Sequence, residues 1–317
     1  MIKPSAGVLT ASVRFHGAEI EAIDLKLERP LRVLAGLHGK RPADCLRLLP
    51  LLFPLCGTAH ALAALQAIEA AATVVPEPVH ASARSTLAMA DRLAAQVWRT
   101  CIDWAPLTQT PAQPRLVAQA RRLVERIARA IYPDGDWQRI GGGRLAPDAI
   151  GLATVRDELR QLQGQLDLAD VQAALRAQMA VAMSGAAPQW TARLNARFVD
   201  MIEAMATSFH TLDTQLEAME GLPATPPASA EQTLQTGQGI GIALTARGEL
   251  CYEFDIDGGQ IQTCRMSAPT DRVFGSDGPV VQLLQRLRQA DDPLLAVRWV
   301  LAAYDPCLEV QVRAFGA

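Results

Sequence analysis

Two segments near opposite ends of the 317-residue sequence carry thiols that could bind a metal. In the first, Cys56 lies four residues before His60, and residues with this spacing share one face of a helix. A cysteine and a histidine on one face could both ligate a transition metal. A zinc site needs about four ligands, and the sequence offers no second pair of this kind. Taken alone, the segment is more simply interpreted as a buried cysteine and a histidine on the helix surface.

The second segment is Asp305-Pro306-Cys307, which by itself is typical of a tight turn. The other thiols have irregular spacing, and no Cys-x-x-Cys pair occurs. Because the cytosol is reducing, we expect no disulfide framework, and each of these thiols is interpreted as a small apolar residue. They are Cys45, Cys101, Cys251 and Cys264, and the histidines without an assigned role are His16, His38, His80 and His210.

The composition argues against several classes of partner. Apolar residues make up 50% of the chain and charged residues 20%, which is the balance of a globular protein with a sizeable core. The formal net charge of −3 gives no basic excess, so nucleic acid is not an expected partner. The longest apolar stretches are interrupted before they reach the length of a membrane span, and residues 1–9 lack a signal-peptide pattern. We therefore expect a cytoplasmic protein that does not bind membranes.

Periodicity predicts a β-hairpin followed by a long helical region. Residues 8–26 alternate in polarity around His16-Gly17, as two antiparallel strands do. Apolar residues then recur at helical spacing over most of the chain from Pro42 to Glu220. The predicted helices cover residues 59–72, 82–104, 114–131, 150–183 and 190–220, with breaks at 132–136 and 140–143 and an interruption near Gly164.

The last third of the sequence has a different pattern. Residues 222–230 are rich in proline, alanine and serine, which is typical of a linker or an exposed loop. Asp257-Gly258-Gly259 predicts a hairpin turn between two strands. The predicted strands cover residues 239–245, 249–255 and 260–267, and two helices that begin near prolines cover residues 279–289 and 293–303.

Together, the two thiol segments resemble motifs of the nickel-iron hydrogenase large subunit. Residues 51–69 resemble its C-G-x-C-x-x-x-H motif and the alanine-rich helix after it, and residues 304–313 resemble its terminal D-P-C-x-x-C-x-x-H motif. Shorter matches follow in the same order between residues 7 and 313: Gly39 to Asp44 with G-R-x-P, Ile140-Gly141-Gly142 with a G-G turn, Gly239 to Leu250 with A-P-R-G, Ala268-Pro269-Thr270 with P-T/S, and Gly278-Pro279-Val280 before a helix.

This resemblance implies the large-subunit fold, which belongs to the α+β class and is mainly helical, with small N-terminal and C-terminal sheets. The two thiol segments are then brought together, so Cys56 and Cys307 should lie close to each other. We expect a single domain over residues 1–317. It would consist of a β-hairpin at 1–30, a helical core at 31–220, a linker at 221–237 and a mixed α/β part at 238–317.

The departures from the enzyme motifs point to a related, non-catalytic family. Phe53 stands where the first cysteine would be, Val310 replaces the second cysteine of the terminal motif, and Arg313 replaces its histidine. The glutamate of the family's R-x-E-G segment is absent at Ala6-Gly7. Two thiolates cannot form a tetrathiolate nickel site, so neither nickel nor hydrogen activation is expected. The pattern resembles the HupK/HoxV family of hydrogenase maturation proteins, which are cytoplasmic assembly factors.

The resemblance also implies which residues form the site. The iron of the enzymes carries two cyanides and one carbon monoxide, and the positions around the cyanides match Arg247, Pro269 and Thr270. Cys56 and Cys307 would be the iron ligands, and His60 could donate a hydrogen bond to a sulfur. Cys56 corresponds to a ligand that bridges nickel and iron. Cys307 corresponds to a terminal nickel ligand, so its thiolate would have to turn toward the iron.

Three functions follow from these residues. The first is a scaffold, not an enzyme, that transiently carries the iron–dicyanide–carbonyl unit to the apo large subunit, with a small carrier chaperone as a further partner. The second is a metal-free interaction protein that mimics the large subunit to hold maturation partners, which the losses at Phe53 and Val310 favour. The third is a residual nickel-iron hydrogenase, which the missing motif positions argue against.

Overall fold

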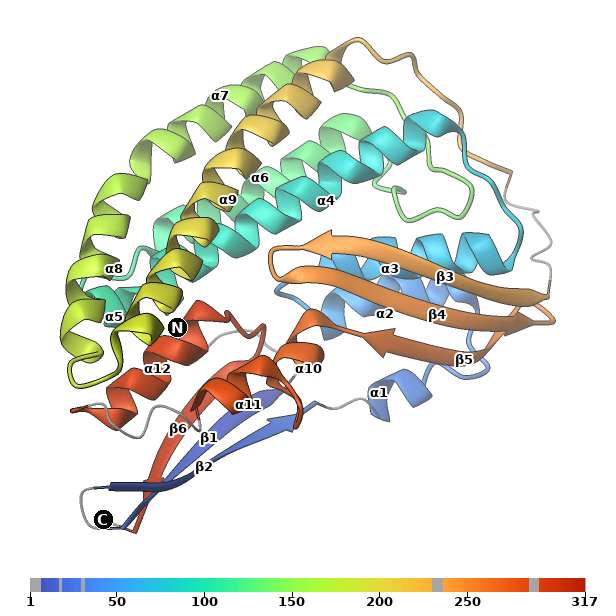
Figure 1. Ribbon diagram of the computed structural model, residues 1–317. Coiled ribbons are helices and arrows are strands. Elements are labelled where there is room, and N and C mark those ends of the chain that lie inside the picture. The colour runs from blue at the N-terminus through green and yellow to red at the C-terminus, as the bar shows by residue number, and fades with distance from the viewer. Residues whose placement is uncertain (1–6, 17–18, 30–31, 230–235, 285–290, 317) are drawn as a thin grey trace.

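The computed structural model describes residues 7–16, 19–29, 32–229, 236–284 and 291–316. Within these residues, long helices lie above two three-stranded sheets (Figure 1). The strands are β1 Val8–His16, β2 Glu19–Glu28, β3 Gly237–Thr245, β4 Gly248–Asp257, β5 Gln260–Ser267 and β6 Glu309–Phe315. The helices are α1 Arg32–Ala35, α2 Pro42–Leu52, α3 Gly57–Ala71, α4 Pro78–Trp98, α5 Ala105–Thr108, α6 Pro114–Ile131, α7 Ala149–Gln165, α8 Leu168–Ala182, α9 Pro188–Glu220, α10 Pro269–Phe274, α11 Pro279–Leu284 and α12 Pro293–Ala303.

Two of the predicted helices are divided in the structure. The predicted helix 150–183 ends as α7 directly after Gly164, and the side chain of Asp167 accepts a hydrogen bond from the backbone N–H of Asp170 to begin α8. The predicted helix 82–104 corresponds to α4, which ends at Trp98, and to the π-helical turn η1 (Arg99–Asp103), which follows it. Such wide turns are frequent at functional sites. The interruption near Gly164 is confirmed, and the π-turn was not predicted.

Helix α3 lies behind the sheet β3-β4-β5 and is buried on almost every side (Figure 1). Its alanines allow an unusually close approach by β3. A Cβ atom added at Gly239 or Gly241 would overlap backbone atoms of Ala63 and Ala67 in α3. These glycines therefore let a strand pack directly on a helix backbone. Close contact of this kind fixes the position of the turn after β3 relative to the start of α3.

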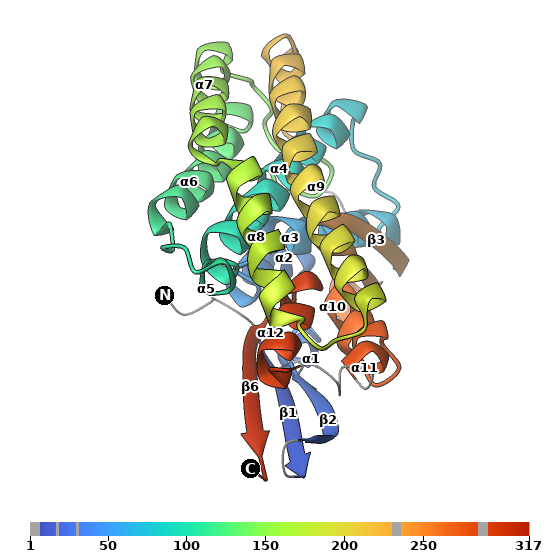
Figure 2. The same ribbon diagram turned by 60° about the vertical axis from the view of Figure 1, so that its left-hand side comes forward.

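The second sheet joins the two ends of the chain. Its strand order is β2-β1-β6, with β1 antiparallel to β2 and parallel to β6. Figure 2 shows these strands side by side below the helices. The hairpin of residues 8–26 is confirmed, although its turn at Gly17 lies outside the described residues. Strand β6 was not predicted, because its residues had been interpreted only as a motif. Its pairing brings Glu309 opposite Val8 and places the C-terminal motif beside the N-terminal hairpin.

Two apolar cores meet beside Cys307. One contains α3, α4, α6, α7 and the sheet β3-β4-β5. The other contains β1, α8, α11 and α12, and includes the edge-to-face aromatic contacts of Phe198 with Trp104 and Trp299. Cys307 is half-buried and packs against both cores, while the 33-residue helix α9 contributes residues to each. The C-terminal thiol therefore lies at the boundary between the two halves of the interior.

The remaining sequence predictions mostly agree with the structure. The predicted α+β, mainly helical class is confirmed. Gly258 and Gly259 have φ angles of 56° and 73°, as the predicted hairpin turn requires. The short helix α10 was not predicted. Helix α11 begins at Pro279 as expected, but residues 285–290 lie outside the described part of the chain. None of the helices in that part is long and apolar enough to span a bilayer.

Candidate functional site

The first thiol lies where the chain enters α3. Cys56 precedes the helix and is buried. The capping contact comes from α4, where the side chain of Asp91 accepts a hydrogen bond of 3.3 Å from the backbone N–H of Ala59. Burial raises the pKa of Asp91 to about 6, although nearby Arg121 opposes the shift. Asp91 therefore accepts a hydrogen bond from one of the free N–H groups at the start of α3, and the Cys56 sulfur makes no capping hydrogen bond.

The second thiol lies in the loop between α12 and β6. Asp305 adopts a left-handed conformation, with φ of 45°, and reverses the chain just before Cys307. The Cys307 sulfur is 3.1 Å from the hydroxyl of Thr270 and 3.1 Å from a guanidinium nitrogen of Arg29. The backbone N–H of Cys307 also donates to the Thr270 hydroxyl over 3.4 Å. The C-terminal thiol is therefore held by residues from α10 and from the end of β2.

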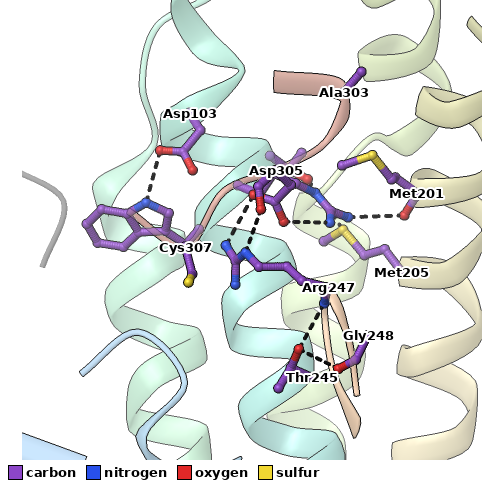
Figure 3. A network of polar contacts seen from close by, with 12 residues as sticks. Asp103, Met201, Met205, Thr245, Arg247, Gly248, Ala303, Asp305 and Cys307 are labelled. Carbon is purple, nitrogen blue, oxygen red and sulfur yellow. Dashed lines mark hydrogen bonds and ion pairs between the residues drawn. The ribbon is translucent and has the colours of Figure 1, made fainter. Parts of the chain in front are cut away.

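Arg247 stands between the two sheets at the β3–β4 turn. Its Nε donates to the backbone carbonyl of Asp305 over 2.8 Å, and its Nη2 donates to the Asp305 carboxylate over 3.1 Å. Arg99 of η1 binds the other oxygen of that carboxylate over 3.2 Å. Figure 3 shows the contacts between the Arg247 guanidinium and Asp305. Asp305 therefore fixes Arg247 to the segment that carries Cys307.

The same guanidinium group lies within electrostatic reach of both thiols. Burial by itself lowers the pKa of Arg247, but Asp305, Cys307 and Cys56 together raise it above its usual value. Burial raises the pKa of Cys56, the charge of Cys307 raises it further, and Arg247 opposes both effects. In Figure 3 the Cys307 side chain lies next to the Arg247 guanidinium. Cys56, Cys307 and Arg247 therefore lie within electrostatic range of one another.

One nitrogen of Arg247, Nη1, is buried and has no hydrogen-bond partner within the part of the chain that the structure describes. A buried donor without a partner costs free energy of roughly 1–3 kcal/mol, so such groups are uncommon in folded proteins. Charged donors bind anionic acceptors especially well. The arrangement is therefore suited to an anionic acceptor next to the two thiols.

Pro269 and Thr270 form the start of α10, which packs on the β3–β4 turn. Both residues are buried. A Cβ atom at Gly248 would be 3.6 Å from the Pro269 ring, so α10 and the turn that carries Arg247 are in close contact. Proline suits the first position of a helix, because its missing N–H would have no partner there. Pro269 thus starts the helix, and Thr270 faces Cys307.

His60 lies deeper than the thiols and has other partners. Its Nδ1 is 2.8 Å from the hydroxyl of Tyr252, and its ring stacks on Phe53 with a centroid separation of 4.0 Å. Burial lowers the pKa of His60 to about 3, so the ring is neutral at pH 7. Phe53 stands where the enzyme motif has a cysteine, so an aromatic stack occupies the position of that thiol. Donation by His60 to a sulfur stays a prediction.

Three polar residues of the site were not predicted from the sequence: Arg29, Asp91 and Arg99. None belongs to a motif, and each depends on a contact between distant segments. In the described part of the chain, no cluster of three or more His, Cys, Asp or Glu side chains is placed to hold a metal ion. A metal bound here would therefore need ligands besides the two thiols.

The sequence of this chain is similar to those of known proteins over almost its whole length. No protein-family model matches the sequence. The chain is 30% identical over 354 aligned residues to the hydrogenase expression/formation protein HupV of Azotobacter chroococcum, covering 98% of this chain and 100% of that protein. The chain belongs to the HupK/HupV family of hydrogenase expression/formation proteins. HupK of Azotobacter vinelandii is 29% identical, with 97% of this chain and 98% of that protein covered.

Solved structures identify the fold of this HupK/HupV chain. The Ni-Fe-Se hydrogenase of D. vulgaris Hildenborough in its reduced state matches with a TM-score of 0.70 and 11% identity, covering 92% of this chain and 94% of that chain. A NAD⁺-reducing [NiFe]-hydrogenase matches with a TM-score of 0.64, 13% identity and coverage of 92% and 93%. The chain therefore has the nickel-iron hydrogenase large-subunit fold, as its motifs predicted.

Proposed function

We propose that this HupK/HupV chain is a maturation scaffold that transiently holds the iron–dicyanide–carbonyl unit before it reaches the apo large subunit. The proposal rests on the buried Nη1 of Arg247, which has no hydrogen-bond partner among the described residues, and on the electrostatic coupling of this guanidinium to the thiols of Cys56 and Cys307. Thiolates are soft ligands that suit ferrous iron, and a cyanide nitrogen is an anionic acceptor for a guanidinium donor. The cargo brings its own diatomic ligands, so two protein thiolates are enough to hold it.

Binding of such a cargo would be linked to proton release. Ligand thiols must lose their protons, and burial raises the pKa of Cys56. Arg247 and Arg29 oppose that shift and favour the thiolate. An anionic iron unit partly neutralises the two arginines and so reduces their effect on the pKa of Cys56. Direct coordination to iron, in contrast, strongly favours the thiolate. The empty scaffold therefore keeps Cys56 protonated, and it becomes a ligand when iron arrives.

The same residues argue that the scaffold is not a hydrogenase. Phe53 occupies the place of one nickel ligand and is packed against His60. Val310, which replaces another, lies on β6 and is 37% exposed. Removing two thiolates leaves too few soft ligands for a nickel site. Hydrogen uptake by the purified protein would contradict this conclusion.

Infrared spectroscopy tests the iron cargo. Protein purified without oxygen from cells that mature a hydrogenase should show cyanide and carbonyl stretching bands. Cys56→Ser and Cys307→Ser should lose these bands, and Cys251→Ser provides a matched control, because Cys251 is also half-buried but lies in β4. Absence of the bands from the wild-type protein, or their survival in both site variants, would rule out iron carriage.

A second function, a metal-free interaction protein that mimics the large subunit, is favoured by the Phe53–His60 stack. This stack fills with apolar contact a place where the enzyme motif has a metal ligand. The two proposals differ in what the double variant Cys56→Ser/Cys307→Ser does to hydrogenase maturation in cells. Iron carriage predicts failure of maturation, whereas the metal-free role predicts normal maturation. Circular dichroism of the variant must first show the native fold.

The partners of the scaffold would be a small carrier chaperone and the apo large subunit, in the cytoplasm. The names of its relatives, which are hydrogenase expression/formation proteins, support this assignment. Size-exclusion chromatography of the purified chain with each purified partner tests it. A shift to a complex with at least one of them is expected, and no shift with either would contradict the assignment.

A further inference from the structure

Strand β3 presents its large apolar side chains to solvent. Residues alternate along it, with Gly239, Gly241 and Ala243 buried against α3. On the opposite face, Ile240 is 61% exposed, Ile242 is 48% exposed and Leu244 is 51% exposed. A strand with one buried face usually places its large apolar residues inward. Strand β3 has the reverse arrangement, so a contiguous aliphatic stripe faces outward.

The stripe cannot turn inward without rebuilding the fold. Any side chain at Gly239 or Gly241 would overlap α3 backbone atoms, so only glycine fits on the buried face. The backbone N–H of Ile242 also donates to the side chain of Gln66 on α3 over 3.1 Å, which helps to fix the strand in register. A shift by one residue would exchange the two faces and drive isoleucine into the helix. The outward position of the stripe is therefore a fixed property of this fold.

An acidic row runs along the next strand on the same face. In the antiparallel register, Leu244 is paired with Glu249, Ile240 with Glu253 and Gln238 with Asp255. Paired residues place their side chains on the same side of a sheet. Two cations lie near this row: the guanidinium of Arg265, on β5, is 3.9 Å from the Glu253 carboxylate, and Arg272 donates to the backbone carbonyl of Glu249 over 2.8 Å, so neither forms a close ion pair with the carboxylates. The outer face thus combines an aliphatic stripe with a row of carboxylates.

We propose that the outer face of β3 and β4 is a docking surface for a protein partner that presents aliphatic side chains flanked by lysine or arginine. Contiguous exposed apolar stripes mark interaction sites in soluble proteins. The carboxylates next to the stripe select a partner of opposite charge. This inference does not depend on the proposed iron cargo.

The same charge argues against other occupants. A second copy of this chain would bring an identical acidic row to the contact, and like charges next to an apolar patch disfavour association. A membrane surface with anionic lipids would be repelled by the carboxylates. A basic, aliphatic protein surface satisfies both features of the face.

The stripe leads directly to the candidate site. Strand β3 ends at Thr245, whose hydroxyl donates to the carbonyl of Gly248 and accepts the backbone N–H of Arg247. These bonds hold the turn that carries Arg247 rigidly at the end of the stripe. A partner bound along β3 is therefore placed beside the two thiols.

Site-specific photo-cross-linking in hydrogenase-producing cells tests the proposal. The photoreactive residue p-benzoylphenylalanine replaces Ile242 in the full-length chain, and the matched control replaces Ile150, an isolated isoleucine that is 81% exposed on α7. We expect an adduct at residue 242 but not at residue 150. Mass spectrometry of the adduct should place the cross-link in an aliphatic segment with lysine or arginine within a few residues.

Charge reversal supplies the second measurement. Glu249→Lys combined with Glu253→Lys should reduce the yield of the adduct about five-fold, as the loss of two exposed charge pairs implies. The variant should keep the wild-type melting temperature, because both carboxylates are exposed. No adduct, an adduct to another copy of this chain, an adduct in an acidic segment, or a yield unchanged by charge reversal would each overturn the proposal.

Discussion

Arg247 and Asp305 are joined at two points, from Nε to the Asp305 carbonyl over 2.8 Å and from Nη2 to its carboxylate over 3.1 Å. The contact connects the β3–β4 turn to the loop before β6. Arg99 approaches the same carboxylate from η1. Both guanidinium groups are buried, so one carboxylate shared by two arginines helps to fix the Cys307 segment, beside the contacts of Thr270 and Arg29 with the thiol.

Removal of that carboxylate should be costly. Asp305→Asn removes the carboxylate that forms ion pairs with two buried guanidinium groups, and we expect the free energy of unfolding in urea to fall by about 3 kcal/mol. The control Asp24→Asn removes an ion pair with Arg14 in which Asp24 is 67% exposed, and it should change the free energy by less than about 1 kcal/mol. Addition of Arg99→Met to Asp305→Asn should recover part of the loss. Equal effects of the two single variants would contradict the role of Asp305.

His60 should make stability depend on pH. Burial lowers its pKa to about 3 in the folded protein, while the usual value is near 6.5. Between these values the unfolded chain binds one proton more than the folded chain, so stability falls as pH decreases below 6.5. The slope from this residue is about 1.4 kcal/mol per pH unit. Below pH 6, Asp91 opposes this loss of stability, because its pKa is raised to about 6 in the folded protein and its protonation there stabilises the fold.

Urea unfolding between pH 7 and 5 checks the contribution of His60. His60→Phe keeps the stack on Phe53 but cannot take a proton, so its stability should decline less steeply than that of the wild type. Asp91→Asn should have the opposite effect between pH 6 and 4, because the stabilising protonation of Asp91 is lost. His210→Phe, at an exposed position, serves as the control. Parallel pH profiles of wild type and His60→Phe would show that His60 does not titrate in this way.

The close packing of β3 on α3 should not tolerate a methyl group. Gly241→Ala would place a Cβ atom against the carbonyl of Ala63, and we expect a loss of about 2 kcal/mol of stability from overpacking. Gly164→Ala in α7 is the matched control, because nothing lies within 4 Å of a Cβ atom at that position. Alanine there should raise the free energy of unfolding by about 0.5–1 kcal/mol. An unchanged free energy of unfolding for Gly241→Ala would show that β3 can move away from α3.

Local sequence patterns predicted most elements of the fold but not the contacts that complete the site. The motif around Arg247 led to this residue, because its position in the turn follows from the sequence nearby. Arg29 and Arg99 carry no comparable signal. Arg29 reaches Cys307 only because β6 pairs with β1, and Arg99 reaches Asp305 only because α4 continues as a π-turn. Both features depend on tertiary packing, which overrides local propensity.

Phe53 stands at the position of a cysteine in the enzyme motif, and its ring stacks on His60. Phe53→Ala should lower the free energy of unfolding by about 3–4 kcal/mol, because a buried aromatic contact becomes a cavity. The control Leu51→Ala, at a position that is 75% exposed, should change it by less than about 0.5 kcal/mol. In a double-mutant cycle, Phe53→Ala and His60→Ala together should cost less than the sum of the single changes, because they share one contact. Additive effects would show that the stack contributes nothing beyond the burial of each ring.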